Sequence, residues 1–480
     1  MEDKRKKDLG VAVKKNEDFS EWYVQVVTRA GLADYSPVKG CMIIKPWGYA
    51  IWEKIQQYLN KKFKEKGVSN AYFPLLIPKS ILEKEQEHVE GFVPEVAWVT
   101  RGGEKELEEP LAVRPTSETI MYATFSKWIR SHRDLPLKIN QWANVVRWET
   151  KSTKLFLRTR EFLWQEGHTV HETKEEAEVM VKEMLDTYEE MAKDLLAIAV
   201  IKGKKTDSEK FAGADYTTTI EGIMPDMKAL QMGTSHMLGQ NFAKAYDIKF
   251  LSRDEKEQYA WQTSWGVSTR LIGALIMVHG DDYGLVLPPA VAPVQVVIVP
   301  IWFKNNKEEV LQYAKEIESL LKDKYEVLLD DRDSHTPGYK FNEWELKGVP
   351  LRIEIGGREA ESKTSVVFRR DTREKVTVSL DKLQEIIASL LTDIQHNLYQ
   401  KSKQFLENSI KEVKDYEELK EIISLKKGAV KAYWCGEEEC EERIKEDTGA
   451  TPRIIAGKGK GKCVVCGQDA TKIIIYAKAY

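Results

Sequence analysis

Apolar side chains recur at helical spacing over residues 46–66. The positions that share one face are Ile51, Ile55, Tyr58, Leu59 and Phe63. Pro46 suits the first turn of a helix and Gly67 suits the position after its end, so one long helix is predicted here. The apolar run 71–77, which Pro78 follows, predicts a strand.

Between residues 115 and 280 the chain alternates strand-like and helix-like patterns without a regular strand–helix–strand rhythm. Strands are predicted over residues 141–149, 162–168, 216–220 and 262–267. Helices are predicted over 115–128, over 173–196 behind a Thr173/Glu176 capping box, and over 269–278 before Gly280. This order favours an antiparallel sheet covered by helices for residues 1–288.

The pattern changes after the pair Pro288-Pro289. Strands at 294–302, 325–330 and 351–355 alternate with helices at 307–321 and from Pro337, which is the order of an α/β domain. A helical linker is predicted at 383–414, and a third unit begins at Tyr416. The chain is therefore predicted to be an α/β multidomain protein divided as 1–288, 289–390 and 391–480, where the last range holds the linker helix and a small C-terminal α+β unit.

Composition agrees with several buried cores and a charged surface. The 480 residues suit about three domains of roughly 150 residues. Apolar residues make up 42%, and the net charge of −3 does not mark a nucleic-acid binder, although such footprints are local patches. No apolar run is long enough to span a membrane, and the charged segment Met1–Lys7 is predicted to be a frayed tail rather than a secretory signal. A cytoplasmic protein without a membrane partner is expected.

Four of the five cysteines lie near the end of the chain. They form two pairs, Cys435-x4-Cys440 and Cys463-x2-Cys466, and Gly467 permits a tight turn after the second pair. Four thiolates suit a structural Zn²⁺ ion, with an iron–sulfur cluster or disulfides as alternatives. This unit has few large apolar residues of its own, so the metal is expected to supply part of its folding energy.

Cations and an aromatic ring are predicted on one face of the hairpin over residues 141–168. Arg147 and Glu149 are two apart on a predicted strand and should point the same way, with Arg158 and Phe162 on the returning strand. A guanidinium suits phosphate and a ring suits adenine. The alternative is a hairpin with surface ion pairs, which contribute little.

Arg270 begins an otherwise apolar helix in the segment Gly266-Val-Ser268-Thr-Arg270. A charge at such a place is costly unless something pairs with it. Either a ligand anion or a buried protein carboxylate would satisfy it, and the sequence leaves both open.

These two segments resemble motifs 2 and 3 of class II aminoacyl-tRNA synthetases, and residues 40–74 resemble motif 1, the dimer-forming element. The resemblance implies a homodimer. It also implies that Arg147 holds the α-phosphate and the amino-acid carboxylate, that Glu149 serves ATP or the tRNA terminus, and that Arg270 binds the γ-phosphate. The resemblance further implies that Arg147 and Arg270 are the catalytic pair, aided by Mg²⁺. The ATP-binding set is Arg147, Glu149, Arg158, Phe162 (stacked on adenine), Gln231, Thr234, Ser268 and Arg270.

Three further segments resemble the prolyl-tRNA synthetases. They are Arg114-Pro-Thr116-Ser117-Glu118, Trp164-Gln-Glu166-Gly-His168, and Gln231-Met-Gly-Thr234-Ser-His236. The secondary ammonium of proline has two N–H donors and needs a carboxylate and a hydroxyl beside it, where the resemblance places Glu118 and Thr116. The implied proline-binding set is Thr116, Glu118, Arg147, Trp164, Glu166, His168 and His236. A helix cap at residues 116–118 and a core histidine at 236 are the alternatives.

The resemblance covers essentially the whole chain and matches the archaeal and eukaryotic-like type. Only about 65 residues separate Glu166 from Gln231, which leaves no room for an inserted editing domain. Residues 289–390 resemble an anticodon-binding domain, so tRNA(Pro) is the expected partner. The implied reaction is the ATP-dependent activation of L-proline to prolyl-adenylate, with release of pyrophosphate, and transfer to the 3′-terminal ribose of tRNA.

Two rival functions stay open at this point. One is a threonyl- or histidyl-type synthetase on the same scaffold. The other is a non-catalytic paralogue that binds tRNA or senses amino acids. An apolar strand at 473–476 near the terminal Tyr480 also predicts a docked C-terminus, which the resemblance places near the active site.

Overall fold

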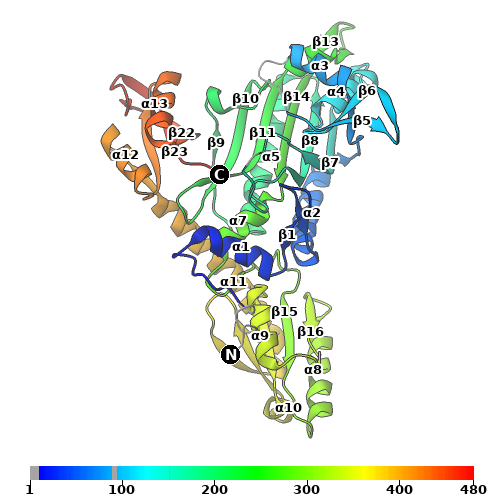
Figure 1. Ribbon diagram of the computed structural model, residues 1–480, viewed down its shortest axis with the longest axis vertical. Helices are drawn as coiled ribbons and strands as arrows, with labels where there is room; N and C mark the ends of the chain where they lie inside the picture. The colour runs from blue at the N-terminus through cyan, green and yellow to red at the C-terminus, as the bar shows by residue number, and fades with distance from the viewer. Residues whose placement is uncertain (1–9, 89–94, 151) are drawn as a thin grey trace.

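The computed structural model of the chain describes residues 10–88, 95–150 and 152–480, so the segment Met1–Lys7 lies outside the described residues. Figure 1 shows three lobes: a large sheet-and-helix lobe, a second lobe at the opposite end of the long axis, and a C-terminal lobe beside the first. Within the described residues, the helices are all too short or too polar to cross a membrane.

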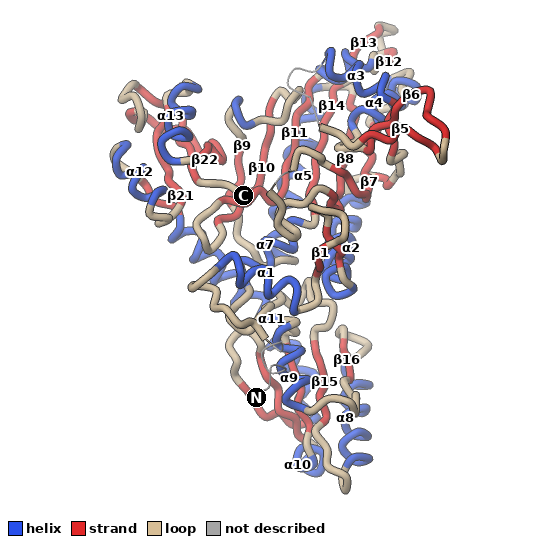
Figure 2. The backbone as a smooth tube through the Cα atoms, in the orientation of Figure 1, coloured by secondary structure: helices blue, strands red, loops and turns tan. Residues whose placement is uncertain are grey.

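An 11-stranded sheet forms the centre of the large lobe and continues into the C-terminal lobe (Figure 2). Its strand order is β20-β21-β23-β22-β9-β10-β11-β14-β8-β7-β3. The middle strands are β7 (Leu137–Val146), β8 (Glu161–His171), β9 (Ile201–Lys204), β10 (Tyr216–Ile223), β11 (Ala229–Gly239) and β14 (Trp261–Ser268), with β3 (Ser69–Asn70) at one edge. Each middle strand pairs antiparallel with its neighbours, which confirms the predicted sheet.

Helices cover one face of this sheet. They are α1 (Phe19–Arg29), α2 (Pro46–Glu65), α5 (Lys174–Asp194) and α7 (Arg270–His279). The predicted apolar face of α2 is buried, since Ile51, Ile55, Leu59 and Phe63 are at most 1% exposed, and each such side chain contributes about 1.5–3 kcal/mol. Gly67 follows α2 with φ +74°, as the helix end requires. The short strands β1 (Ala33–Tyr35) and β2 (Met42–Ile44) lie before α2.

A smaller layer adjoins the sheet near β7. It contains β4 (Leu76–Pro78), β5 (Trp98–Gly102) and β6 (Lys105–Val113) in one sheet, β12 (Lys249–Leu251) and β13 (Glu257–Tyr259) in another, and helices α3 (Lys79–His88), α4 (Glu118–Trp128) and α6 (Asn241–Tyr246). The strand predicted at 71–77 is wrong in extent. Only residues 76–78 form β4, because the preceding backbone bonds outside a ladder: Gln141 accepts from the Phe73 N–H at 2.5 Å.

The second lobe is the predicted α/β domain with two added strands. Its sheet has the order β16-β15-β17-β18-β19, in which β15, β16 and β17 are parallel and the last two pairs are antiparallel. The bounds are β15 (Val296–Pro300), α8 (Lys307–Leu321), β16 (Val327–Leu329), α9 (Pro337–Leu346), β17 (Leu351–Ile355), α10 (Gly357–Ser362), β18 (Thr364–Arg369) and β19 (Lys375–Ser379). The hairpin β18–β19 was missed because its outer strand is largely exposed.

One helix, α11 (Leu380–Ser409), joins this lobe to the C-terminal lobe. Its first half packs into the core of the α/β domain through Leu383, Ile387 and Leu391. The helix therefore runs straight through the boundary predicted at 390/391. Its far end, at Leu406, packs beside Ile454 and Ile475 of the C-terminal lobe.

The C-terminal lobe is an extension of the central sheet. Its elements are β20 (Ile410–Glu412), α12 (Tyr416–Ser424), β21 (Ala429–Trp434), α13 (Glu438–Thr448), β22 (Thr451–Lys462) and β23 (Asp469–Ala477), and β22 pairs with β9 at Ile455 and Lys204. The expectation that this unit has few large apolar residues is wrong. Leu419, Ile423, Val430, Trp434, Ile444, Ile474 and Tyr476 form its own buried core.

Candidate active site

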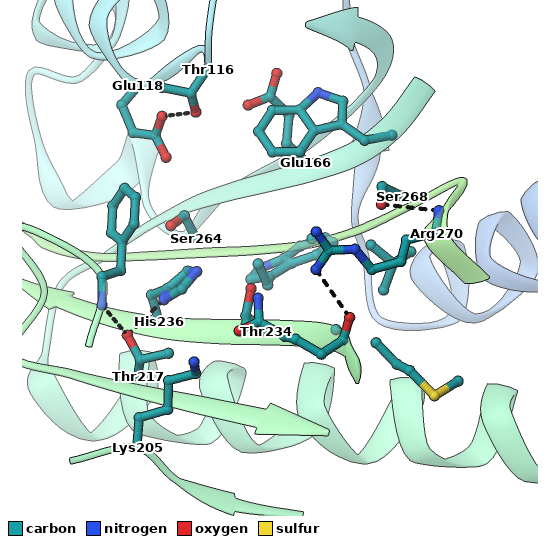
Figure 3. Close-up of a pocket in the computed structure, with 18 of the residues that line it drawn as sticks. Thr116, Glu118, Glu166, Lys205, Thr217, Thr234, His236, Ser264, Ser268 and Arg270 are labelled. Carbon is teal, nitrogen blue, oxygen red and sulfur yellow. Dashed lines mark hydrogen bonds between the residues drawn. The ribbon is translucent and has the colours of Figure 1, made fainter. Parts of the chain in front are cut away.

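A cavity of about 300 Å³ opens over β8, β11 and β14. Alternate residues of a strand point to the same face, and the lining from β8 follows this rule with Phe162, Trp164, Glu166 and His168. The lining from β11 comprises Gln231, Met232, Gly233, Thr234 and His236, and that from β14 comprises residues 264–268. Figure 3 shows Thr116, Glu118 and Glu166 toward one side of the cavity and Arg270 toward the other. We call these sides the acidic end and the basic end.

The acidic end is a closed hydrogen-bond network around Glu166. Ser117 donates to this carboxylate from its hydroxyl and, at 3.2 Å, from its backbone N–H, and Gln141 Nε2 donates at 3.1 Å. His168 Nε2 lies 3.2 Å from Glu166 Oε2, while its Nδ1 lies 2.9 Å from the Tyr122 hydroxyl. Glu166 is thus held in one orientation before any ligand arrives.

Glu118 is the carboxylate of the acidic end that keeps bonding capacity for a ligand. It is the first residue of α4, and Thr116 Oγ1 donates to its Oε2. Glu118 and Thr116 are 4% and 6% exposed, and both line the cavity. The helix-cap alternative fails for the side chains, because the N-cap residue Ser117 makes no side-chain cap bond and donates to Glu166 instead.

Burial and hydrogen bonding shift the pKa values of Glu118 and Glu166 in opposite directions. Burial raises the pKa of Glu118, with the charge of His168 opposing and that of Glu166 adding to the rise. Burial alone would also raise the pKa of Glu166, but hydrogen bonds from His168, Ser117 and Gln141 lower it below its usual range. Burial would lower the pKa of His168, yet the bond to Glu166 and the nearby carboxylates raise it. Glu166 and His168 therefore form an ion pair, next to which Glu118 is the more easily protonated acid.

His236 forms part of the wall between the two ends. Its Nδ1 lies 2.9 Å from the Thr217 hydroxyl, and its ring packs on Phe211 with centroids 4.8 Å apart. Burial, with smaller effects of Lys205 and His168, lowers the pKa of His236 to about 3, so the ring is neutral. The alternative of a core histidine satisfied by hydrogen bonds holds as well, since His236 is satisfied and still lines the cavity.

The basic end contains two half-buried arginines whose hydrogen bonds go to neutral oxygens. Arg147 Nε donates to the Pro115 carbonyl at 3.3 Å, and its guanidinium lies 5.4 Å from the Phe162 ring centroid and 5.5 Å from that of Trp164. Arg270 Nε donates to the Leu157 carbonyl at 3.1 Å, and its Nη1 lies 3.4 Å from the Gln231 carbonyl. Burial and then the charges of Arg147 and Arg158 lower the pKa of Arg270 to about 10.

Among the residues that the structure describes, neither Arg147 nor Arg270 forms a salt bridge with a carboxylate. The buried ion-pair alternative for Arg270 therefore finds no carboxylate partner among the described residues. Two like charges that face one cavity without counter-charges make a site for an anion.

Glu149 and Arg158 lie elsewhere than predicted. Strand β7 ends at Val146, so Arg147 and Glu149 do not share a strand face, and Glu149 is exposed in the turn that follows. Arg158 lies before β8 in a tight turn, where its N–H donates to the Lys154 carbonyl at 2.9 Å. Both are absent from the lining of the cavity, and their roles at ATP stay predictions.

Sequence reasoning missed one wall of the cavity. Lys205, Glu209, Lys210 and Phe211 line it from the connection between β9 and β10, and Thr217 lines it from β10. The segment contains the short 3-10 helix η3 (Asp207–Glu209). Its mixed charges are typical of an ordinary surface loop, so no local signal in the sequence distinguishes it.

The four C-terminal cysteines converge at the edge of the extended sheet. Cys435 follows β21, Cys440 lies on α13, and Cys463 and Cys466 follow β22. The Sγ atoms of Cys435 and Cys440 are 3.6 Å apart and those of Cys435 and Cys466 3.8 Å, close to the edge of about 3.8 Å of a tetrahedron with Zn–S bonds of about 2.3 Å. These separations are too long for disulfides, whose S–S bonds are about 2.05 Å.

Two details support a metal at the cysteines rather than at the acidic end. Gly467 has φ +73°, as the tight turn beside the second cysteine pair requires. Glu118, Glu166 and His168 also lie close enough to hold an ion. However, both oxygens of Glu166 and both nitrogens of His168 already bond to protein groups.

Each of the three lobes matches the model of a known protein family. The family model described as tRNA synthetase class II core domain (G, H, P, S and T) matches residues 98–279, and that of the anticodon binding domain matches residues 295–390. A third model, prolyl-tRNA synthetase, C-terminal, matches residues 416–480. A proline–tRNA ligase from Natranaerobius thermophilus is 55% identical over 469 residues, 97% of either chain. The chain belongs to the prolyl-tRNA synthetase family.

Other members of the prolyl-tRNA synthetase family agree. A proline–tRNA ligase of Alkaliphilus oremlandii is 56% identical over 466 residues, 96% of either chain. The crystal structure of the Cryptosporidium parvum prolyl-tRNA synthetase complexed with halofuginone and AMPPNP superposes with a TM-score of 0.94 at 46% identity, covering 98% of this chain and 100% of that one. A second structure of that enzyme, complexed with L-proline and AMP, gives a TM-score of 0.92 at 45% identity, covering 98% and 97%.

The predicted family, fold class and enzyme class are thereby confirmed: the chain is a ligase that activates proline and joins it to tRNA. The threonyl and histidyl alternatives and the non-catalytic paralogue are excluded by the same relatives. Residues 166–231, all of them described, form the end of β8, α5, β9, η3, β10 and the start of β11. These elements all lie within the synthetase core that the first family model matches, so this stretch contains no inserted domain, as expected for the type without an editing domain.

Proposed function

We propose that the cavity joins L-proline to the α-phosphate of ATP and then passes the prolyl group to tRNA(Pro). The observation that supports this most is the division of one cavity into a carboxylate end and an end with two arginines that form no salt bridge with a carboxylate of the described residues. Proline has a cationic amine and an anionic carboxylate, so it fits with its amine at Glu118 and its carboxylate toward Arg147. ATP then lies along the basic end.

The two steps need placement and charge neutralisation rather than a covalent enzyme intermediate. The proline carboxylate attacks the α-phosphate of ATP, and pyrophosphate leaves with the electron pair of the broken P–O bond. The terminal ribose hydroxyl of tRNA then attacks the prolyl carbonyl, and AMP leaves. Arg147 neutralises the α-phosphate and orients the carboxylate, Arg270 binds the γ-phosphate, and Phe162 stacks on adenine. Mg²⁺ on the phosphates is part of this proposal.

Specificity for proline follows from the acidic end. Thr116 and Glu118 provide a hydroxyl and a carboxylate for the two N–H donors of a secondary ammonium, and Trp164, His168 and His236 surround a small ring. The Cryptosporidium parvum structure with L-proline and AMP, 45% identical, supports the assignment. The test is ATP–pyrophosphate exchange with each of the twenty amino acids. Exchange with threonine or histidine above that with proline would contradict it, whereas some activity with alanine or cysteine would not.

We also propose that the protein is a homodimer of the cytoplasm without a membrane partner. The support is a set of exposed apolar side chains on β1, β2, α2 and the segments beside them. These are Tyr35, Val38, Ile43, Tyr49 and Tyr72, which are 41–71% exposed. Light scattering at micromolar concentration tests the dimer, and a monomeric mass would contradict it.

For the C-terminal lobe we propose one structural Zn²⁺ per chain, bound by Cys435, Cys440, Cys463 and Cys466. Because the lobe has its own apolar core and is joined to the central sheet, chelation is expected to loosen the cysteine edge first rather than to unfold the lobe outright. Elemental analysis together with limited proteolysis tests both parts. Iron, or no metal, in the purified protein would contradict the assignment.

A further inference from the structure

The wall of the cavity that sequence reasoning missed is attached to the C-terminal lobe. Residue Ser208, in η3, donates its hydroxyl to Glu441 Oε2 on α13. The hydroxyl of Thr206 lies 3.5 Å from the same oxygen and 3.0 Å from the Ser208 hydroxyl. Glu441 and Thr206 are buried, at 4% and 2% exposed, whereas Ser208 is exposed, so the Thr206 side of this cluster is shielded from solvent, where polar contacts are stronger.

A second contact anchors the same wall one strand away. Arg453 on β22 makes a bidentate pair with Glu221 on β10, at 2.8 and 2.9 Å. Lys205 Nζ lies 3.9 Å from Glu221 Oε1. Glu209 Oε2 lies 4.0 Å from Arg453 Nη1. The two ends of the segment 205–209 are therefore held between charges of the C-terminal lobe and of the catalytic sheet.

The segment has little internal structure to fix it otherwise. A 3-10 helix of three residues is not stable alone. Thr206 is its N-cap residue but makes no side-chain cap bond, because the hydroxyl is directed at Glu441. The backbone bond from Glu209 N–H to the Thr206 carbonyl, at 3.2 Å, spans a single turn. The Lys205 N–H also donates to the Thr217 carbonyl on β10 at 2.9 Å, so the wall is held both by the catalytic sheet and by the C-terminal lobe.

The far end of the segment reaches the amino-acid pocket. Phe211 donates its backbone N–H to Thr217 Oγ1 at 2.9 Å, and the same hydroxyl lies 2.9 Å from His236 Nδ1. The Phe211 ring packs on His236, as described above. A shift of η3 would be transmitted to Phe211 two residues later and from there to the wall of the pocket.

We propose that Glu441 is a positioning residue for the amino-acid pocket, acting through Ser208 and Thr206 on the wall 205–211, with Arg453 as the second anchor. The C-terminal lobe then has a role in substrate binding although none of its residues lines the cavity. The proposal rests on the proposed activation of proline. It assigns the effect to the binding of the amino acid and not to that of ATP, because Phe211 and His236 lie on the proline side of the assigned site.

The test is ATP–pyrophosphate exchange by the full chain with Glu441→Ala, Glu441→Gln, Ser208→Ala and the double variant Ser208→Ala/Glu441→Ala. Loss of the hydrogen bond to a charged group is expected to raise KM for proline about tenfold in Glu441→Ala, with KM for ATP unchanged. Glu441→Gln keeps an accepting oxygen and is expected to restore most of the binding. The double variant should be no worse than Glu441→Ala, because both changes remove the same contact. Glu442→Ala is the matched control, since Glu442 is exposed on the same helix.

Each possible result of these measurements either supports or overturns the role of Glu441 in the amino-acid pocket. Equal changes in KM for both substrates, a fall in kcat with KM for proline unchanged, or additive effects in the double variant would overturn the proposal and leave Glu441 as a structural residue. If Glu441→Ala does not fold, Ser208→Ala on the wall itself gives the same answer through KM for proline. An unmodified protein without proline-dependent exchange would instead remove the proposed function, so the two failures are distinguishable.

Discussion

At the acidic end of the cavity, Glu166 accepts hydrogen bonds from Ser117, Gln141 and His168, whereas at the basic end Arg147 and Arg270 reach only carbonyl oxygens. The first end is arranged by protein groups that satisfy one another. The second holds charge that the described protein groups do not neutralise. The difference indicates that the amino-acid pocket is formed in advance, while the phosphate site gains its electrostatic balance from the ligand.

This division has a cost in stability and a benefit in catalysis. A half-buried guanidinium that forms no salt bridge among the described residues costs stability, and burial, the first cause of the lowered pKa of Arg270, acts in the same direction. The same charge needs no reorganisation when phosphate arrives, so it can act fully in the transition state. The acidic end costs the folded protein less stability, because its charged groups pair with each other inside the protein.

The largest expected effect is therefore at the basic end. Arg147→Ala and Arg270→Ala should each lower kcat for ATP–pyrophosphate exchange at least about 100-fold, since each removes a preorganised charge from the α- or γ-phosphate. The melting temperature should stay the same or rise, because removing one arginine relieves repulsion from the other. Exchange kinetics and thermal denaturation of the same preparations measure both.

Arg114→Ala is the matched control for this comparison. Arg114 is 1% exposed and donates to the carbonyls of Asn144 and Phe73 and to the Asn144 side chain, at 2.8–2.9 Å. Its removal leaves buried acceptors unpaired at about 1–3 kcal/mol each, so it should lower the melting temperature clearly. A fall of similar size in Arg147→Ala or Arg270→Ala would mean that those arginines are structural too.

The next effect is at the acidic end. Glu118→Gln keeps the shape of the side chain and removes its charge, so KM for proline should rise about 10- to 100-fold, the range for a lost hydrogen bond to a charged group. KM for ATP should change little, because the basic end is untouched. Competition by a ring analogue that lacks the amine should be equal in both proteins. A larger change in KM for ATP than for proline would assign Glu118 to the wrong ligand.

The pH dependence of proline binding should be smaller and of known sign. The carboxylate form of Glu118 binds the ammonium. Because burial raises the pKa of Glu118, that form is present above the raised pKa and is lost as the pH falls through it, earlier than for an ordinary glutamate. KM for proline should thus increase toward acid pH, and the charge of His168 beside Glu118 opposes part of this effect because it favours the carboxylate. The slope of log KM against pH should flatten in Glu118→Gln. An unchanged slope would mean that another group titrates.

Parts of the fold could be predicted from local pattern because the pattern and the packing agree there. Helix α2, with its apolar face and Pro46 and Gly67 at its ends, and the α/β order of the second lobe are of this kind. The joining of β22 to β9 could not be predicted. It depends on pairing between residues about 250 positions apart, at Lys204 and Ile455, and pairs at such separation leave no mark in a single sequence.

Some residues of the site could likewise be predicted from the sequence, and others could not. Residues in short motifs on strands, such as Trp164, Glu166 and His168, were identified by resemblance and lie together in the cavity. Glu149 was placed on the same strand face as Arg147 because the end of β7 was put three residues too late, an ordinary error at strand ends. The wall from Lys205 to Phe211 was missed because its place is set by contacts with Glu441 and Arg453, which are distant in sequence.

The smallest expected effect concerns the terminal residue, which lies on the side of the basic end. Tyr480 donates its hydroxyl to Asp226 Oδ2 at 2.9 Å and its backbone N–H to the Ala229 carbonyl at 3.2 Å, which confirms a docked C-terminus. Lys154 Nζ lies 5.9 Å from the centroid of its ring. Lys154 begins the turn whose Leu157 carbonyl accepts from Arg270 Nε.

Deleting Tyr480 should therefore weaken ATP binding through the Lys154 turn. A cation–π contact of about 0.5–1 kcal/mol corresponds to an increase in KM for ATP of about two- to fivefold, with KM for proline and the melting temperature nearly unchanged. Tyr480→Phe keeps the ring and loses the bond to Asp226, so it should resemble the unmodified protein more closely than the deletion does. Steady-state exchange at varied ATP separates the variants. The idea fails if the deletion leaves exchange unchanged, in which case the docked tail is a passive closure of the sheet, or if it raises KM for proline instead, in which case the C-terminus acts at the acidic end together with Glu441.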